Sequence, residues 1–280
     1  MSENVRKQLQ LNASLPKGSK KRYKRSKSSK KNVSEPTQPS PTQQQPEPQV
    51  VAAEVIAPEF DVDIAQEVVF KPNPGPQTSF LSASEREVLY GGAAGGGKSF
   101  AMLADPLHGL NDPNFSGLLV RHTTEELREL IQKSQELYPK AIPGIKWSER
   151  KSQWIAPRGG RLWMSYLDKD MDVTRYQGQA FNWIGFDELT QWPTPYAWDY
   201  MRSRLRSAFS SQLGLYMRAT TNPGGNGHQW VKKMFIDPSP PNDSFWATNI
   251  ETGDTIKFPK GHSREGQPLF KRRFIPASLF

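Results

Sequence analysis

The chain of 280 residues contains no cysteine. This absence excludes a disulfide framework, a thiolate metal site and a cysteine nucleophile. Histidine is scarce too, with four residues in the chain. They are scattered, and none has a partner at the spacing of a metal site, so the sequence does not predict a histidine metal site. No apolar run approaches the ~18 residues of a membrane span, and the charged N-terminus lacks the apolar core of a signal peptide. We therefore expect a soluble, intracellular protein with no membrane partner.

Acidic residues are nearly absent from the first 34 positions, which hold eleven Lys or Arg against one acid, Glu3, a net +10. The whole chain carries +9, so the remainder carries about −1. The alkaline pI therefore describes a tail and does not indicate a basic folded surface. Two interpretations of this tail stay open: an electrostatic arm that neutralises DNA phosphates, or a solubilising extension without a specific target.

Apolar residues are also sparse in residues 35–50, which are rich in proline and glutamine. Neither this segment nor the basic one can bury enough apolar surface to offset the entropy of ordering. We predict a disordered tail over residues 1–70, with a basic part at 1–34 and a Pro/Gln-rich part at 35–50. The folded domain is predicted to cover residues 71–280.

Within that domain, short apolar segments alternate with helical patterns, which is typical of a sheet with crossover helices. The predicted strands lie at 87–90, 117–121, 154–156, 161–166, 183–187 and 214–220. The predicted helices lie at 98–110 with a kink at Pro106, after the capping pair Thr123 and Glu126, at 196–208 and at 229–236. The turn at residues 157–160 (PRGG) predicts a hairpin between two strands and hence an antiparallel edge.

Residues 92–99 read GAAGGGKS and fit the pattern G-x-x-x-x-G-K-[ST] at every fixed position. They follow a predicted strand and open a predicted helix, which is the context that this motif requires. Glycines let backbone N–H groups converge on phosphates, and the helix N-terminus adds partial positive charge. A chance glycine turn of this pattern arises about once in a hundred such chains. The predicted nucleotide-binding residues here are Gly92, Ala93, Ala94, Gly95, Gly96, Gly97, Lys98 and Ser99.

Lys98 is expected to neutralise the β- and γ-phosphate oxygens of ATP, and Ser99 to ligate Mg²⁺. A second motif, at residues 181–188 (FNWIGFDE), is an apolar strand that ends in Asp187 and Glu188. Two adjacent carboxylates are tolerated at the carboxyl edge of a sheet, where α/β proteins bind ligands. We predict that Asp187 holds Mg²⁺ and that Glu188 is the catalytic residue that polarises water; an ordinary helix cap is the alternative. These motifs predict an α/β fold, a P-loop NTPase with a mostly parallel central sheet flanked by helices and an antiparallel edge hairpin.

Two further features complete the predicted site. Residues 219–225 (ATTNPGG) place Thr221 and Asn222 after another strand, where small polar side chains can sense a γ-phosphate, although a plain turn is the alternative. Hydrolysis also needs an arginine that stabilises the transition state, and in multimeric ATPases this arginine can enter a neighbour's site. The candidates are Arg121, Arg175 and Arg204, each of which has an ordinary surface role as its alternative.

The ordered set of Gln77, the P-loop, the Asp-Glu pair and residues 221–224 resembles the ATPase domain of the large terminase subunit of tailed bacteriophages. The resemblance covers about residues 72–280. It implies that Gln77 reads adenine and that Thr221 and Asn222 couple hydrolysis to movement. Some members of the family place an arginine directly before the glycine equivalent to Gly178; that position is Gln177 here, so Arg175 is only a candidate for the finger.

The same resemblance implies a ring of identical subunits that pushes double-stranded DNA into a procapsid. Its implied partners are the portal protein and the small terminase subunit, and its implied location is the host cell cytoplasm. Members of this family usually continue into a nuclease domain, whereas this sequence stops at Phe280, so no nuclease activity is expected of it. Two other hypotheses stay open at this point: a helicase-like or recombinase-like ATPase, and a DNA-binding remnant driven by the basic tail.

Overall fold

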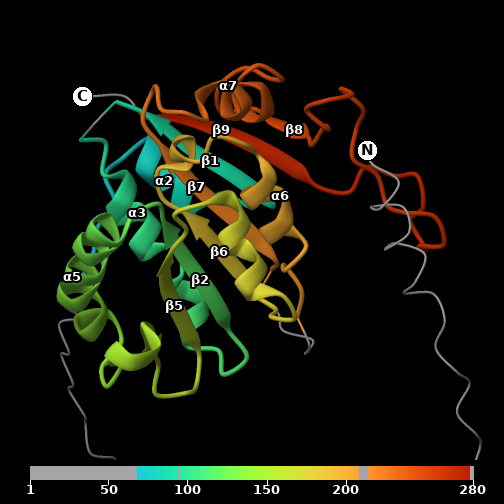
Figure 1. Ribbon diagram of the computed structural model, residues 1–280. Helices are drawn as coiled ribbons and strands as arrows, with labels where there is room; N and C mark the ends of the chain where they lie inside the picture. The colour runs from blue at the N-terminus through green and yellow to red at the C-terminus, as the bar shows by residue number, and fades with distance from the viewer. Residues whose placement is uncertain (1–67, 94, 208–213, 278–280) are drawn as a thin grey trace, which may run out of the picture. The chain divides into compact units, whose positions relative to one another are not determined.

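The computed structural model describes residues 68–93, 95–207 and 214–277 (Figure 1). The chain divides into a unit at residues 1–62, which lies outside these ranges, and a unit at residues 63–280. The predicted disordered tail, except for its last three residues, and Ala94 of the P-loop thus lie outside the described residues. No helix in the described ranges is long and apolar enough to cross a membrane.

The described residues form one mixed sheet with the strand order β3-β4-β5-β2-β6-β7-β1-β9-β8. The six strands from β5 to β9 in this order are parallel, and the pairs β3–β4, β4–β5 and β8–β9 at the edges are antiparallel. The strands are β1 (Glu87–Gly92), β2 (Ser116–Arg121), β3 (Lys146–Ser148), β4 (Gln153–Ile155), β5 (Arg161–Tyr166), β6 (Trp183–Phe186), β7 (Tyr216–Thr221), β8 (Ser244–Trp246) and β9 (Lys271–Ala277). The mostly parallel sheet and the antiparallel edge hairpin are therefore confirmed.

Helices cover both faces of this sheet (Figure 1). They are α2 (Pro76–Leu81), α3 (Lys98–Ala104), α4 (Leu107–Leu110), α5 (Thr124–Ala141), α6 (Tyr196–Arg202) and α7 (His228–Val231), with the 3₁₀ helices η2 (Glu149–Lys151), η3 (Asp170–Tyr176) and η4 (Leu189–Gln191) and the π-helix η5 (Lys232–Ile236). The capping box at Thr123 and Glu126 is present. The single helix predicted at 98–110 was wrong, because Pro106 separates α3 from α4 instead of kinking one helix.

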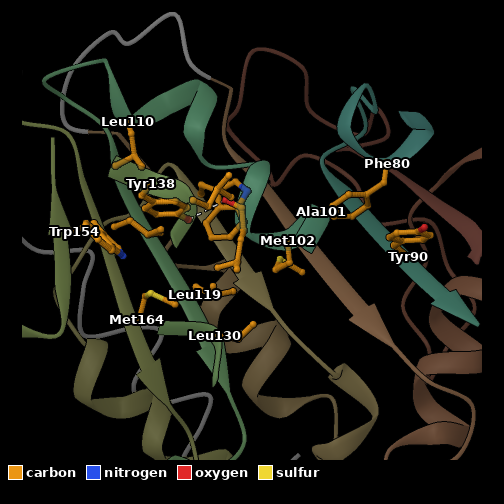
Figure 2. Close-up of a cluster of buried hydrophobic side chains, with 14 of the residues drawn as sticks. Phe80, Tyr90, Ala101, Met102, Leu110, Leu119, Leu130, Tyr138, Trp154 and Met164 are labelled. Carbon is orange, nitrogen blue, oxygen red and sulfur yellow. Dashed lines mark hydrogen bonds between the residues drawn. The ribbon is translucent and has the colours of Figure 1, made fainter. Parts of the chain in front are cut away.

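The hydrophobic core lies in two layers, one on each face of the sheet. Along β2, Leu119 faces the layer beneath α3 and α5, whereas Leu118 and Val120 face the layer beneath α6 and α7. This alternation follows from the two-residue period of a strand. Figure 2 shows the first layer, in which the hydroxyl of Tyr138 on α5 donates to the carbonyl of Leu103 on α3 at 2.9 Å.

Strand β9 was not predicted, although it lies beside the P-loop strand β1 in parallel register. Its residues KRRFIPA carry three cations and a proline, which locally disfavour a buried strand. The structure compensates one of these charges with Glu87, which is fully buried and pairs with Arg272 at 2.8 Å and with Arg202 of α6. Burial alone would raise the pKa of Glu87, but the two arginines lower it to about 2.

Candidate functional site

The P-loop connects β1 to α3 and needs glycine at two positions. Gly97 has φ = +67°, and a Cβ there would lie 2.6 Å from the side-chain nitrogen of Gln77. Gly92 has φ = +135°, and a Cβ there would lie 2.4 Å from the carbonyl oxygen of Ala277 on β9. Only glycine fits both this conformation and these close approaches. The predicted turn is therefore shaped by two neighbours that are remote in the sequence.

Lys98, the first residue of α3, is buried and turns back over the loop. Its Nζ donates to the carbonyl oxygens of Ala93 at 2.6 Å and Gly92 at 3.3 Å. Burial lowers the pKa of Lys98, while Glu188 and Asp187 act in the opposite direction. The ammonium group thus lies among acceptors inside the cradle, which is where a P-loop lysine meets phosphate oxygens.

Gln77 of α2 is buried against the P-loop. Its Nε2 donates to the carbonyl of Gly97 at 3.0 Å, and its Oε1 accepts from the backbone N–H of Asn73 at 2.6 Å. These bonds fix the orientation of the side-chain amide. The structure therefore places Gln77 as a brace of the P-loop, while its role toward adenine stays a prediction.

A pocket of about 350 Å³ opens beside the P-loop. It is lined by Gly95, Gly97, Lys98, Ser99, Phe100, Lys133, Glu188 and Asn222. Five of these eight belong to the predicted phosphate and catalytic motifs and Asn222 to the predicted coupling motif, but Lys133 and Phe100 were not anticipated. Lys133 comes from α5, where it pairs with Glu129 at 2.6 Å. No local pattern distinguishes it from an ordinary surface lysine, because its place beside the pocket depends on how α5 packs.

Asp187 follows β6 directly and is fully buried. Its Oδ1 accepts a hydrogen bond from the hydroxyl of Thr220, and its Oδ2 lies 2.9 Å from Nε of Arg121 but receives no hydrogen bond. Ser99 offers a hydroxyl on the pocket wall. Mg²⁺ prefers oxygen donors and is commonly held by one or two protein oxygens together with substrate phosphates. Ser99 and Asp187 offer such oxygens, although Ser99 lines the pocket and Asp187 does not.

Glu188 is the residue of this site with an unusual backbone, because it lies in the left-handed region with φ = +62°. Non-glycine residues adopt this conformation rarely, and it is concentrated at functional positions. The backbone N–H of Glu188 donates to Oγ1 of Thr220 at 3.0 Å. Burial and the nearby Asp187 raise the pKa of the Glu188 carboxyl. The turn therefore exposes the Glu188 carboxylate to the pocket while Asp187 stays beneath it.

The predicted coupling residues contact both the catalytic acid and the loop that follows it. Asn222 donates to Oε1 of Glu188 from its side chain at 2.8 Å and to Oε2 from its backbone N–H at 3.0 Å. Thr221 donates to the hydroxyl of Thr190 in η4 at 2.8 Å, and the carbonyl of Thr190 accepts from Gly227 before α7 at 2.7 Å. The structure thus joins Thr221 and Asn222 to the acid and to α7.

The three candidate arginines lie in different places. Arg121, at the end of β2, is buried beside Asp187 within the site. Arg175 in η3 is exposed and does not line the pocket; its guanidinium donates to the carbonyl of Tyr166 at 2.6 Å. Arg204 accepts a backbone hydrogen bond from Phe181, just before β6, and so lies at the opposite edge of the sheet from Asp187. Among these three, Arg121 alone therefore reaches the site of its own chain.

Three features define a P-loop NTPase. The P-loop follows β1, the acid pair follows β6, and the polar end of β7 lies in the sheet between these two strands. Residues 89–254, more than half of the chain, match the family "Terminase large subunit, T4likevirus-type, N-terminal". The chain therefore belongs to this family and is the ATPase domain of a large terminase subunit, part of a phage DNA-packaging motor.

One solved terminase domain shows the same fold, and two further solved structures align over smaller parts of this chain. The large terminase ATPase domain of Thermus phage P74-26 aligns with a TM-score of 0.50 at 12% identity, over 74% of this chain and 81% of that chain. The large terminase of another thermophilic bacteriophage aligns with a TM-score of 0.46 at 14% identity, over 57% of this chain and 41% of that chain. The N-terminal domain of the DNA packaging ATPase from bacteriophage phi29 aligns with a TM-score of 0.40 at 17% identity, over 52% of this chain and 77% of that chain. A comparison with curated protein sequences gives no match.

Proposed function

We propose that this domain hydrolyses ATP in the pocket between the P-loop and β6. The backbone of residues 92–97 and Lys98 bind the phosphates. Ser99 and Asp187 would hold Mg²⁺, which would supply neutralisation of the charge on the phosphate oxygens. Arg121 pairs with Oδ2 of Asp187 and Thr220 donates to Oδ1, so the two contacts together fix the orientation of the carboxylate. Glu188 polarises the attacking water.

The observation that carries this proposal is the placement of Glu188. Its carboxylate lies on the same pocket wall as Lys98 and Ser99, and two hydrogen bonds from Asn222 fix its orientation. A general base has to be oriented before its pKa matters. The raised pKa then favours proton acceptance, because a carboxylate destabilised by burial is a stronger base than an exposed one.

Gln77 reads adenine through the same amide that braces Gly97, so that base recognition and the shape of the P-loop are linked.

Arg175 enters the site of a neighbouring copy in a ring. Its exposure and its hydrogen bond to Tyr166 support this role, because an exposed and oriented guanidinium can serve a partner without reaching its own pocket. Thr221 and Asn222 couple the state of the site to α7.

The domain at residues 71–280 acts as the motor in the host cytoplasm, with double-stranded DNA, the portal of the procapsid and the small terminase subunit as its partners. Family membership supports this assignment. The basic residues 1–34 add electrostatic attraction to DNA or keep the chain dispersed.

The test is ATP turnover of Glu188→Gln with DNA and procapsids present. We expect a loss of about 10²-fold or more with retained ATP binding, because the isosteric amide cannot accept the proton. Lys98→Ala is the complementary variant and should lose binding itself. If the parent protein shows no ATPase activity under these conditions, the proposal is wrong.

A further inference from the structure

We infer that residues 247–270, here called the arm, grip the phosphate backbone of duplex DNA through three cations at its tip. This inference rests on the proposed motor function and names the element that holds the substrate. The arm leaves the sheet after β8 and returns into β9. In Figure 1 this orange-to-red segment extends beyond the sheet next to β8 and β9.

The arm is an exposed segment with defined internal bonding. It is closed by antiparallel bridges between Thr248 and Thr255 and between Lys257 and Pro268. At its tip the backbone N–H of Phe258 donates to Gln267 at 2.9 Å. Every residue from 257 to 267 is exposed except Phe258, which is half-buried. Connections longer than about 12–15 residues inside a domain are uncommon and are usually either functional or disordered, and the internal bonding of the arm favours the first.

The charge at the tip is concentrated. Residues 257–267 contain three cations, Lys257, Lys260 and Arg264, against one acid, Glu265, whereas the other two acids of the arm, Glu251 and Asp254, lie nearer its base. None of these three cations forms an ion pair with any residue that the structure describes. The adjacent Glu265 instead accepts the backbone N–H of Gly261 at 2.8 Å. Unpaired, exposed cations without an exposed large apolar side chain among them favour phosphate over an apolar protein groove.

One cation is also held in place. The guanidinium of Arg264 lies 4.2 Å from the centroid of the Phe258 ring, and the His262 ring stacks on Phe258 at 4.4 Å. The backbone N–H of Arg264 donates to Nδ1 of His262 at 3.0 Å. A side chain that is already oriented loses less entropy when it binds a phosphate. Such contacts carry no base readout, which suits a motor that must move any sequence.

The base of the arm is tied to the strand that carries the P-loop. Arg272 of β9 donates from its guanidinium to the carbonyl of Thr248 at 2.8 Å and pairs with Glu87 of β1. The same two strands continue in register to Gly92 and Ala277, where the backbone of Ala93 bonds to Ala277. The paired strands β1 and β9 thus connect the arm to the P-loop. The proposed DNA-binding segment and the nucleotide site are therefore attached to the same pair of strands.

The test measures binding of the full-length protein to a fluorescent duplex of arbitrary sequence over a range of salt concentrations. For Lys257→Ala/Lys260→Ala we expect affinity to fall about 10-fold near 0.1 M salt, with the slope of log K against log salt smaller by up to about 2. Lys257→Arg/Lys260→Arg should retain binding. Both variants keep Arg264 and therefore its contacts with Phe258 and His262. The matched control is Lys140→Ala/Lys146→Ala, which removes two exposed lysines from α5 and β3.

All variants keep residues 1–34, so the basic tail contributes equally to each measurement. Nucleotide binding, followed with a fluorescent ATP analogue, should be unchanged in every variant. If Lys257→Ala/Lys260→Ala binds DNA with the affinity and salt slope of the control, the inference is overturned. The proposed motor function is tested separately, and it would still stand if the parent protein hydrolyses ATP with DNA and procapsids present. Conversely, a parent without that activity would overturn the motor function even if its arm binds DNA.

Discussion

Asn222 binds both carboxylate oxygens of Glu188, one with its side-chain amide at 2.8 Å and the other with its backbone N–H at 3.0 Å. The acid that we propose to activate water is therefore attached to the loop that continues to α7. Any displacement of this loop moves or releases the Glu188 carboxylate. We therefore propose that Asn222 positions Glu188 for hydrolysis, in addition to its proposed coupling role.

Asn222→Ala should lower ATP turnover by about 10-fold while leaving ATP affinity nearly unchanged, because it removes one of the two bonds that orient the base. The same bond stabilises the ionised carboxylate, so its loss should raise the pKa of Glu188 further. The acid limb of the pH profile of kcat should therefore move to higher pH. Asn114→Ala, at an exposed position before β2, is the control. An unshifted acid limb would argue against this positioning role.

Arg175→Ala should reduce turnover by about 10³-fold, as for other arginines that stabilise phosphoryl transfer, without weakening ATP binding. Arg204→Ala, at the opposite edge of the sheet, should have little effect. Mixing Arg175→Ala with Glu188→Gln distinguishes action within one chain from action on a neighbour. In a mixed ring, an intact Glu188 receives Arg175 from the adjacent subunit, so activity should partly return; no recovery would contradict action on a neighbour.

Lys133→Ala should raise the Kd for ATP by about 3- to 10-fold, with the difference shrinking at high salt, because a partly exposed cation on the pocket wall is screened by ions. Glu129→Gln, which releases Lys133 from its ion pair, should bind ATP as tightly as the parent or more tightly. Lys140→Ala on the same helix is the control, because Lys140 does not line the pocket. Titration with a fluorescent nucleotide measures all three, and equal Kd values for Lys133→Ala and Lys140→Ala would remove Lys133 from the site.

Glu87→Gln should lower the free energy of unfolding by about 3–5 kcal/mol, because it leaves Arg202 and Arg272 without their shared buried partner. The folded-state pKa of Glu87 is about 2 and lies below its ordinary value of 4.5. Its contribution is therefore fully present above about pH 4.5 and is lost as the pH falls toward 2. Denaturant unfolding of the parent and the variant should show a difference that narrows over this window. A difference independent of pH would show that the ionised carboxylate is not the cause.

The sequence by itself determined the chemistry of the site, because that chemistry depends on short segments. The P-loop, the acid pair and the Thr-Asn turn each follow a strand, and parallel strands bring their carboxyl ends to one edge of a sheet. The order of these motifs predicted the fold class and the family, and both are confirmed. The hairpin at residues 153–166 was equally local, because its turn residues specify it.

The tertiary structure alone decided which distant residues complete this site. Arg121 meets Asp187, Asn222 meets Glu188, and Lys133 reaches the pocket, each across a long stretch of sequence. Strand β9 was not predicted because a buried strand with an arginine is unfavourable by itself. Arg272 is stabilised by its ion pair with Glu87, which lies 185 residues earlier in the sequence. Local sequence specifies which chemical groups are present, whereas long-range packing fixes the distances between them. The partnership of acid, asparagine and arginine could therefore be recognised only in the folded chain.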